Sequence, residues 1–129
     1  MGEDRTHHRA AICLLTALIG TLLLSACHHD ATPLVPGGDP EKGKAEIVTY
    51  GCGSCHTIPG VAGANGMVGP PLLSWSRRSI IAGELPNTPV NLIRWIEMPQ
   101  AIEPGTAMPN LGVKEEEAKD IAAYLYTLR

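Results

Sequence analysis

Phenylalanine is absent from this chain of 129 residues, and the other aromatic residues are few, with two Trp and three Tyr. A domain of this size buries only about two-thirds of its unfolded surface and usually needs a disulfide, a metal or a cofactor as well. A strong charge of one sign is also lacking, since the formal net charge is −3. That balance argues against the basic surface of a nucleic-acid-binding protein. The sequence predicts one small domain with an incomplete core.

Cysteine and histidine are scarce in the second part of the chain. After Cys27 the only cysteines are Cys52 and Cys55, and no histidine follows His56. A zinc site built from these residues is one ligand short of the usual four. A histidine pair as the two axial ligands of a metal is excluded for the same reason.

What is present is the stretch YGCGSCHTIPG, in which Cys52, Cys55 and His56 have the spacing C-x-x-C-H. This spacing is typical of covalent haem attachment, in which both thiols add to the haem vinyl groups and the adjacent imidazole ligates the iron. A thioredoxin-like redox pair instead needs a strand before the motif and a helix after it. Haem is the favoured interpretation, and it would fill the incomplete core. A disulfide pair and a zinc site remain as alternatives.

The N-terminal part has the features of an export signal over residues 1–26. Two arginines near the start precede an apolar run, Ala10–Leu24, which is short for a membrane-spanning helix. The run leads into LSAC, which resembles the bacterial lipobox and predicts lipidation of Cys27 as the mature N-terminus. An uncleaved N-terminal anchor with an incidental Cys27 is the alternative. Residues 27–38, rich in Pro and Gly and without apolar periodicity, predict a flexible tether.

Residues 39–129 predict the folded domain, which begins with a helix over Pro40–Tyr50. Asp39 is a good N-cap, Pro40 a good first residue and Gly51 a plausible stop. A glycine inside this helix, Gly43, predicts close approach of another helix.

Three further helical segments are predicted. The last, residues 114–129, has an apolar stripe and acidic residues in its first turn, which are expected to be solvated. Residues 88–98 begin with a Thr-Pro cap and end before Pro99. Residues 76–83 predict a short helix, while residues 58–72 and 99–112 are predicted to be loops.

Three methionines follow the attachment motif and are candidates for a second iron ligand. Met67 lies close to the motif in sequence, and Met98 lies at the end of a predicted helix. Met108, in the loop before the last helix, is favoured. A thioether ligand opposite an imidazole raises the reduction potential of haem iron.

The segments GDPEKGKAEI, CGSCHTIPG, GPPL, PGTAMPNLGV and DIAAYLYTL occur in this order, and together they resemble a class I c-type cytochrome over residues 38–129. The resemblance implies an all-α cytochrome c fold, with about four helices wrapped around one covalent haem c and its iron. It also implies a one-electron carrier and not an enzyme.

The resemblance assigns roles to individual residues. Cys52 and Cys55 match the thioether pair, His56 the proximal iron ligand and Met108 the distal one. Pro70, in GPPL, matches the proline whose carbonyl accepts a hydrogen bond from the proximal imidazole.

Four more residues are assigned to the haem pocket or compete for a place in it. Arg78 falls where the family often has an arginine near a haem propionate, and Arg77 is its rival. Trp95 falls where the family has an aromatic residue beside the methionine ligand. Trp75 is expected to line the pocket or to reach a propionate through its indole N–H.

These features predict a membrane-anchored lipoprotein that faces the periplasm or the outer surface of the cytoplasmic membrane. Its expected role is to carry electrons in a respiratory chain, with a terminal oxidase and a quinol-oxidising complex as partners. The lysine-rich rim of mitochondrial cytochrome c is absent from the region of the motif. A haem enzyme or gas sensor with a labile sixth ligand is an alternative, and a haem-free thiol–disulfide oxidoreductase is another.

Overall fold

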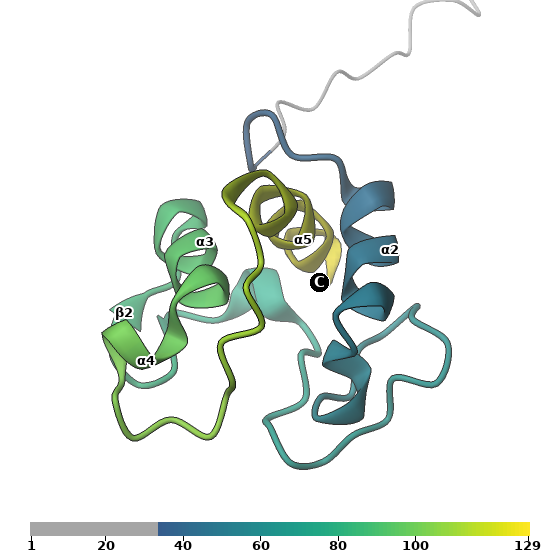
Figure 1. The fold of residues 1–129 in the computed structure, drawn as a ribbon. Coiled ribbons are helices and arrows are strands. Elements are labelled where there is room, and N and C mark those ends of the chain that lie inside the picture. The colour runs from purple at the N-terminus through teal and green to yellow at the C-terminus, as the bar shows by residue number, and fades with distance from the viewer. Residues whose placement is uncertain (1–33) are drawn as a thin grey trace, which may run out of the picture. The chain divides into compact units, whose positions relative to one another are not determined.

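A computed structural model describes residues 34–129 (Figure 1). The predicted signal peptide, Cys27 and the first part of the predicted tether lie outside the described residues. Within residues 34–129, no helix is both long enough and apolar enough to cross a membrane. The elements of the described part are α2 (Pro40–Thr49), η1 (Cys52–Ser54), η2 (Trp75–Arg77), β1 (Ile80–Ile81), β2 (Leu85–Pro86), α3 (Pro89–Glu97), α4 (Pro99–Ile102) and α5 (Glu115–Thr127).

The packed part of the chain begins before the predicted boundary at Asp39. Val35 is only 2% exposed, and its carbonyl accepts a hydrogen bond from the Gly38 N–H at 3.2 Å. A Cβ atom on Gly38 would lie 2.7 Å from the Lys119 carbonyl oxygen in α5. The predicted tether over residues 27–38 is therefore too long at its C-terminal end.

Helix α2 begins and ends as the sequence predicts, to within one residue. The Asp39 carboxylate accepts hydrogen bonds from the N–H groups of Glu41 and Lys42, at 3.0 and 3.3 Å. Pro40 occupies the first turn, where no N–H is needed. Gly51 follows the helix with a φ of +68°, a conformation that glycine adopts without strain.

Helices α2 and α5 cross at Gly43, as predicted. A Cβ atom there would lie 1.9 Å from the Asp120 carbonyl oxygen, so no larger residue fits. The Asp120 carboxylate also accepts a hydrogen bond from the Asp39 N–H at 2.7 Å. Figure 1 shows α5 with α2 on one side and α3 on the other, and both pairs are in contact.

The start of α5 differs from the prediction. Glu117 is not merely solvated, because its carboxylate accepts hydrogen bonds from the Lys114 N–H at 3.0 Å and from the Tyr50 hydroxyl at 2.6 Å. The bond to Tyr50 lowers the pKa of Glu117 and raises the pKa of Tyr50 to about 12. Glu117 thus caps α5 and ties it to the C-terminal end of α2.

Two of the predicted segments between α2 and α5 are wrong. The helix expected over residues 76–83 is instead η2 followed by an antiparallel hairpin that pairs Ile81 with Leu85. Ala82 and Gly83 both have positive φ, as in the type I′ turn of a hairpin. A right-handed helix needs negative φ and cannot continue through these two residues. The loop expected over residues 99–112 contains α4, because Pro99 is compatible with a helix's first turn although it cannot continue α3.

One hydrophobic core joins the helices to the loop segments. In the described residues, no polar or charged residue is buried as a whole. The most deeply buried large side chains come from all parts of the domain: Ile47, Ile81, Leu92 and Pro99. The fold is thus mainly helical, with four helices in the described part, in agreement with the predicted class.

Candidate functional site

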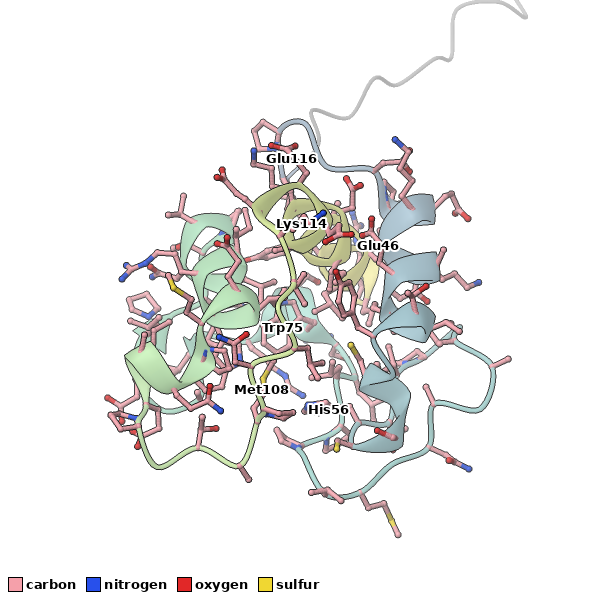
Figure 2. All side chains as sticks on the ribbon, viewed as in Figure 1. Glu46, His56, Trp75, Met108, Lys114 and Glu116 are labelled. Atoms are coloured by element: carbon pink, nitrogen blue, oxygen red, sulfur yellow. The ribbon has the colours of Figure 1, made fainter. Side chains whose placement is uncertain are left out.

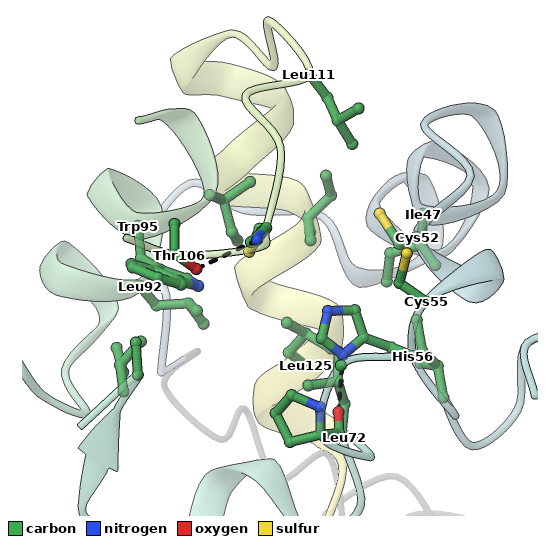
Figure 3. Close-up of a pocket in the computed structure, with 18 of the residues that line it drawn as sticks. Ile47, Cys52, Cys55, His56, Leu72, Leu92, Trp95, Thr106, Leu111 and Leu125 are labelled. Carbon is green, nitrogen blue, oxygen red and sulfur yellow. Dashed lines mark hydrogen bonds between the residues drawn. The ribbon is translucent and has the colours of Figure 1, made fainter. Parts of the chain in front are cut away.

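The cysteine motif forms a tight turn directly after α2. Cys52 opens a single turn of 3₁₀ helix, and its carbonyl accepts hydrogen bonds from the N–H groups of Cys55 and His56, at 3.2 and 3.0 Å. Both thiols are free and half-buried. Figure 3 shows the two cysteines and His56 beside one cavity. The turn therefore presents two thiols and an imidazole to the same space.

The orientation of the His56 ring is fixed by a hydrogen bond. Its Nδ1 lies 2.7 Å from the Pro70 carbonyl oxygen, and since a carbonyl only accepts, Nδ1 must donate. In the neutral ring, this tautomer places the free lone pair on Nε2, the state that a metal-ligating histidine needs. A Cβ atom on Gly69 would lie 2.3 Å from the ring, so Gly69 permits this approach. Sequence reasoning missed Gly69, although its place before Pro70 marks a special backbone position.

Only one of the three candidate methionines reaches this cavity. Met108 is half-buried and lines it, whereas Met67 and Met98 are 91% and 50% exposed and lie outside the lining. Figure 2 shows Met108 and His56 on two different loops of the domain.

Two hydrogen bonds that sequence reasoning missed hold the Met108 loop in place. The Met108 N–H donates to the Thr106 hydroxyl oxygen at 3.2 Å, and the Met108 carbonyl accepts from the Gln100 side-chain amide at 2.7 Å. The threonine two residues before the methionine is a detectable turn signal. The Gln100 contact depends on α4, which the sequence did not predict.

The cavity has a volume of 370 Å³, within the range of about 300–1,000 Å³ that is common for ligand and cofactor sites. Its walls are mainly apolar and come from α2, α3, α5 and the loops between them. Residues of these walls that Figure 3 labels are Ile47, Leu72, Leu92, Trp95, Leu111 and Leu125.

A few polar groups interrupt the apolar walls. Trp75 lines the cavity and is 5% exposed, and its buried indole Nε1–H has no hydrogen-bond partner. Such an orphaned donor is unusual in a native protein and indicates a polar group of a bound molecule. The Arg78 guanidinium lies 5.1 Å from the Trp75 ring centre and donates to the carbonyls of Pro71 and Leu73. Of the two rival arginines, Arg78 lines the cavity, while Arg77 is exposed and lies outside the lining.

The Cys52 thiol lacks one feature of a redox catalyst. Burial raises the pKa of the Cys52 thiol. A thiol–disulfide oxidoreductase needs the opposite, a low pKa at the start of a helix. Within residues 34–129, no three His, Cys, Asp or Glu side chains are placed to hold one metal ion together.

A family model for cytochrome c matches residues 40–129, which is most of the chain and the whole of the site. The chain belongs to the cytochrome c family. Members of this family carry electrons on a covalently bound haem c with its iron, so the predicted fold class and cofactor are confirmed.

Two relatives agree with this assignment. The chain is 36% identical over 106 residues to cytochrome c2 of Rhodopila globiformis, an alignment that covers 73% of this chain and 97% of the relative. It is also 33% identical over 89 residues to cytochrome c oxidase subunit 2 of Alkalihalophilus pseudofirmus, over 68% of this chain. The match spans only 25% of the length of that oxidase subunit.

The residues of this cytochrome c site suit a covalent haem. The cavity offers two thiols from one turn, an imidazole with a free Nε2, a thioether and mainly apolar walls. The unpartnered indole N–H of Trp75 and the nearby guanidinium of Arg78 suit a propionate.

Proposed function

We propose that this chain is a respiratory electron carrier in which Cys52 and Cys55 bind the haem vinyl groups, and His56 and Met108 ligate the iron. When bound, haem c supplies a reversible one-electron couple. The protein holds the imidazole through the Pro70 carbonyl and the thioether through the Thr106 loop. Trp75, Arg78 and Trp95 complete the pocket.

One observation carries the proposal: an imidazole and a thioether reach the same cavity from two loops that lie far apart in the sequence. Because His56 and Met108 would both ligate the iron, no substrate would need to bind it, and the site is suited to electron transfer. A ligand set of one imidazole and one thioether favours the reduced state relative to two imidazoles.

The ligand assignment is tested on holoprotein from a host that matures c-type haem. Met108→Ala is expected to abolish the sulfur-to-iron charge-transfer band of the oxidised protein and to permit rapid binding of carbon monoxide to the reduced protein. Met98→Ala is the matched control and should change neither. Rapid carbon monoxide binding by the unaltered protein would instead support an enzyme or gas sensor with a labile sixth ligand.

The attachment residues have a separate test. A peptide that contains Cys52 and Cys55 should carry the mass of one haem after digestion of the holoprotein. A peptide of unmodified mass from a coloured preparation would overturn the thioether assignment.

We infer a terminal oxidase as the electron acceptor. This inference is supported by the similarity to a segment of an oxidase subunit 2. Oxygen consumption by membranes that contain a terminal oxidase should rise when the reduced protein is added, and the Met108→Ala variant should give little of this rise. A quinol-oxidising complex is the corresponding electron donor.

We further propose that Cys27 is lipidated after export, and that residues following it link the domain to the outer surface of a membrane. A lipid anchor raises the local concentration of the carrier near membrane partners. Cys27→Ser should release haem-loaded protein into the soluble fraction. Cys13→Ser should leave the protein at the membrane, since Cys13 belongs to the segment that is removed.

A further inference from the structure

Asn87 lies between β2 and α3, and every polar atom of its side chain has a partner. Its amide nitrogen donates to the carbonyl oxygens of Trp75 and Arg78, at 3.0 Å each. Its amide oxygen accepts from the Tyr126 hydroxyl at 2.9 Å. Its backbone N–H donates to the Ser79 carbonyl at 2.9 Å.

The chemistry of these partners permits only one orientation of the amide. The two carbonyls are acceptors and must face the NH₂ group, while the Tyr126 hydroxyl can donate to the oxygen. Tyr126 is 8% exposed and belongs to α5, the most extensively packed helix. Asn87 thus joins the backbone of η2 to a rigid element.

The two carbonyls that Asn87 holds belong to the residues that present polar groups to the cavity. Trp75 supplies the unpartnered Nε1–H, and Arg78 supplies the guanidinium that lies over the Trp75 ring. A second tie holds the same turn, because the N–H and the hydroxyl of Ser76 both donate to the Leu128 carbonyl, at 3.0 and 2.9 Å. The end of α5 therefore fixes η2 from outside the cavity.

From these contacts we infer that Asn87 is a positioning residue that aims Trp75 and Arg78 at the propionate side of the haem, and so helps to set its reduction potential. This inference rests on the proposed function, because the propionate is the group that the two side chains would meet. Asn87 itself is absent from the cavity lining and acts only through them.

The experiment compares Asn87→Ala with Asn91→Ala in haem-loaded protein. Asn91 is the matched control, since its amide donates to the Pro86 carbonyl at 2.9 Å and has no hydrogen bond to η2. In the reduced protein, hydrogen exchange of the Trp75 indole N–H should become about tenfold faster in Asn87→Ala, with the Trp95 indole as internal reference. Asn91→Ala should leave the Trp75 rate unchanged.

The potential gives a second readout. Weaker donors at a propionate favour the oxidised state, so the oxidised-to-reduced ratio of Asn87→Ala at a fixed solution potential should rise about threefold. The same substitution should add little in a Trp75→Phe, Arg78→Gln background, because the residues through which it acts are gone. A full shift in that background would overturn the inference.

Tyr126→Phe decides the matter if Asn87→Ala does not accumulate as holoprotein. It removes the hydroxyl that donates to the Asn87 amide oxygen, so the Asn87 side chain is held less firmly. Hydrogen exchange of the Trp75 indole N–H should then become about threefold faster. An unchanged Trp75 rate in a folded, coloured variant would overturn the role of Asn87 alone. A colourless wild-type protein would instead overturn the proposed function.

Discussion

The two sides of α5 are built in different ways. On the α2 side, backbones touch at Gly43, and hydrogen bonds from Asp39 to Asp120 and from Tyr50 to Glu117 close the two ends of the crossing. Toward α3 and the loops, α5 lines a cavity of 370 Å³, to which α2 contributes Ile47. The α2–α5 pair is completed by protein atoms, whereas the cavity side depends on a haem to complete its core.

Loss of haem should have the largest effect. Without haem, the mainly apolar walls of this 370 Å³ cavity lose their packing partners, and the whole stability of a small domain is only about 5–15 kcal/mol. The double variant Cys52→Ala, Cys55→Ala is therefore expected to lose cooperative urea unfolding, measured by circular dichroism.

Residual structure in the Cys52→Ala, Cys55→Ala variant should be confined to the α2–α5 pair. Amide exchange should be slowest in α2 and α5, and residues of the hairpin and the Met108 loop should exchange freely. Met67→Ala is the control, because Met67 is 91% exposed and makes no part of the cavity. Equal protection on both sides of α5 would contradict the comparison.

Gly43→Ala disturbs the close contact between α2 and α5, the part of the fold that protein atoms complete. A Cβ atom would lie 1.9 Å from the Asp120 carbonyl oxygen, so the helices must separate. The expected loss is about 3 kcal/mol of unfolding free energy, measured by denaturant titration of the holoprotein. Ala45→Gly, on the exposed face of the same helix, should cost only about 1 kcal/mol. Equal or smaller loss at Gly43 would show that the crossing can relax.

The same contrast explains what the sequence could predict. The ends of α2 and the approach at Gly43 depend on local signals, namely a cap, a proline and a glycine inside a helix, and these were readable. The hairpin was not, because the two isoleucines of β1 form too short an apolar run for its periodicity to distinguish a strand from a helix. The positive φ of Ala82 also cannot be predicted from an alanine.

The residues of the candidate site also fall into two groups, those that local sequence signals predict and those that depend on the tertiary fold. The Cys52, Cys55 and His56 spacing was readable because one turn positions all three. Supporting contacts from Gln100 and Asn87 were not, since each links segments whose proximity depends on the tertiary fold.

Tyr50→Phe tests the hydrogen bond that closes the crossing, through its pH dependence. The Glu117 pKa is lowered by the Tyr50 hydroxyl, so this contribution is lost as the pH falls below the ordinary range of a glutamate. The Tyr50 pKa is raised to about 12, so stability is also lost as the pH rises from about 10. The variant should be less stable at neutral pH and nearly equal to the wild type at both extremes. A constant difference across this range would contradict the pairing.

Glu46→Gln is expected to give the smallest effect, and a gain. One carboxylate oxygen of Glu46 is buried without a partner, and burial, followed by the charges of Asp120 and Glu117, raises its pKa. A raised carboxyl pKa means that the folded state binds its proton more tightly, so stability from this group falls as the pH rises through that pKa. Glu46→Gln should therefore unfold at a slightly higher denaturant concentration at pH 7, and the gain should vanish in acid. Glu41→Gln is the control: Glu41 lies exposed in the first turn of α2, where a negative charge is favourable, and its loss should be neutral or slightly destabilising at pH 7. A gain from Glu41→Gln as large as that from Glu46→Gln would mean that the relief comes from net charge and not from the α2–α5 contact.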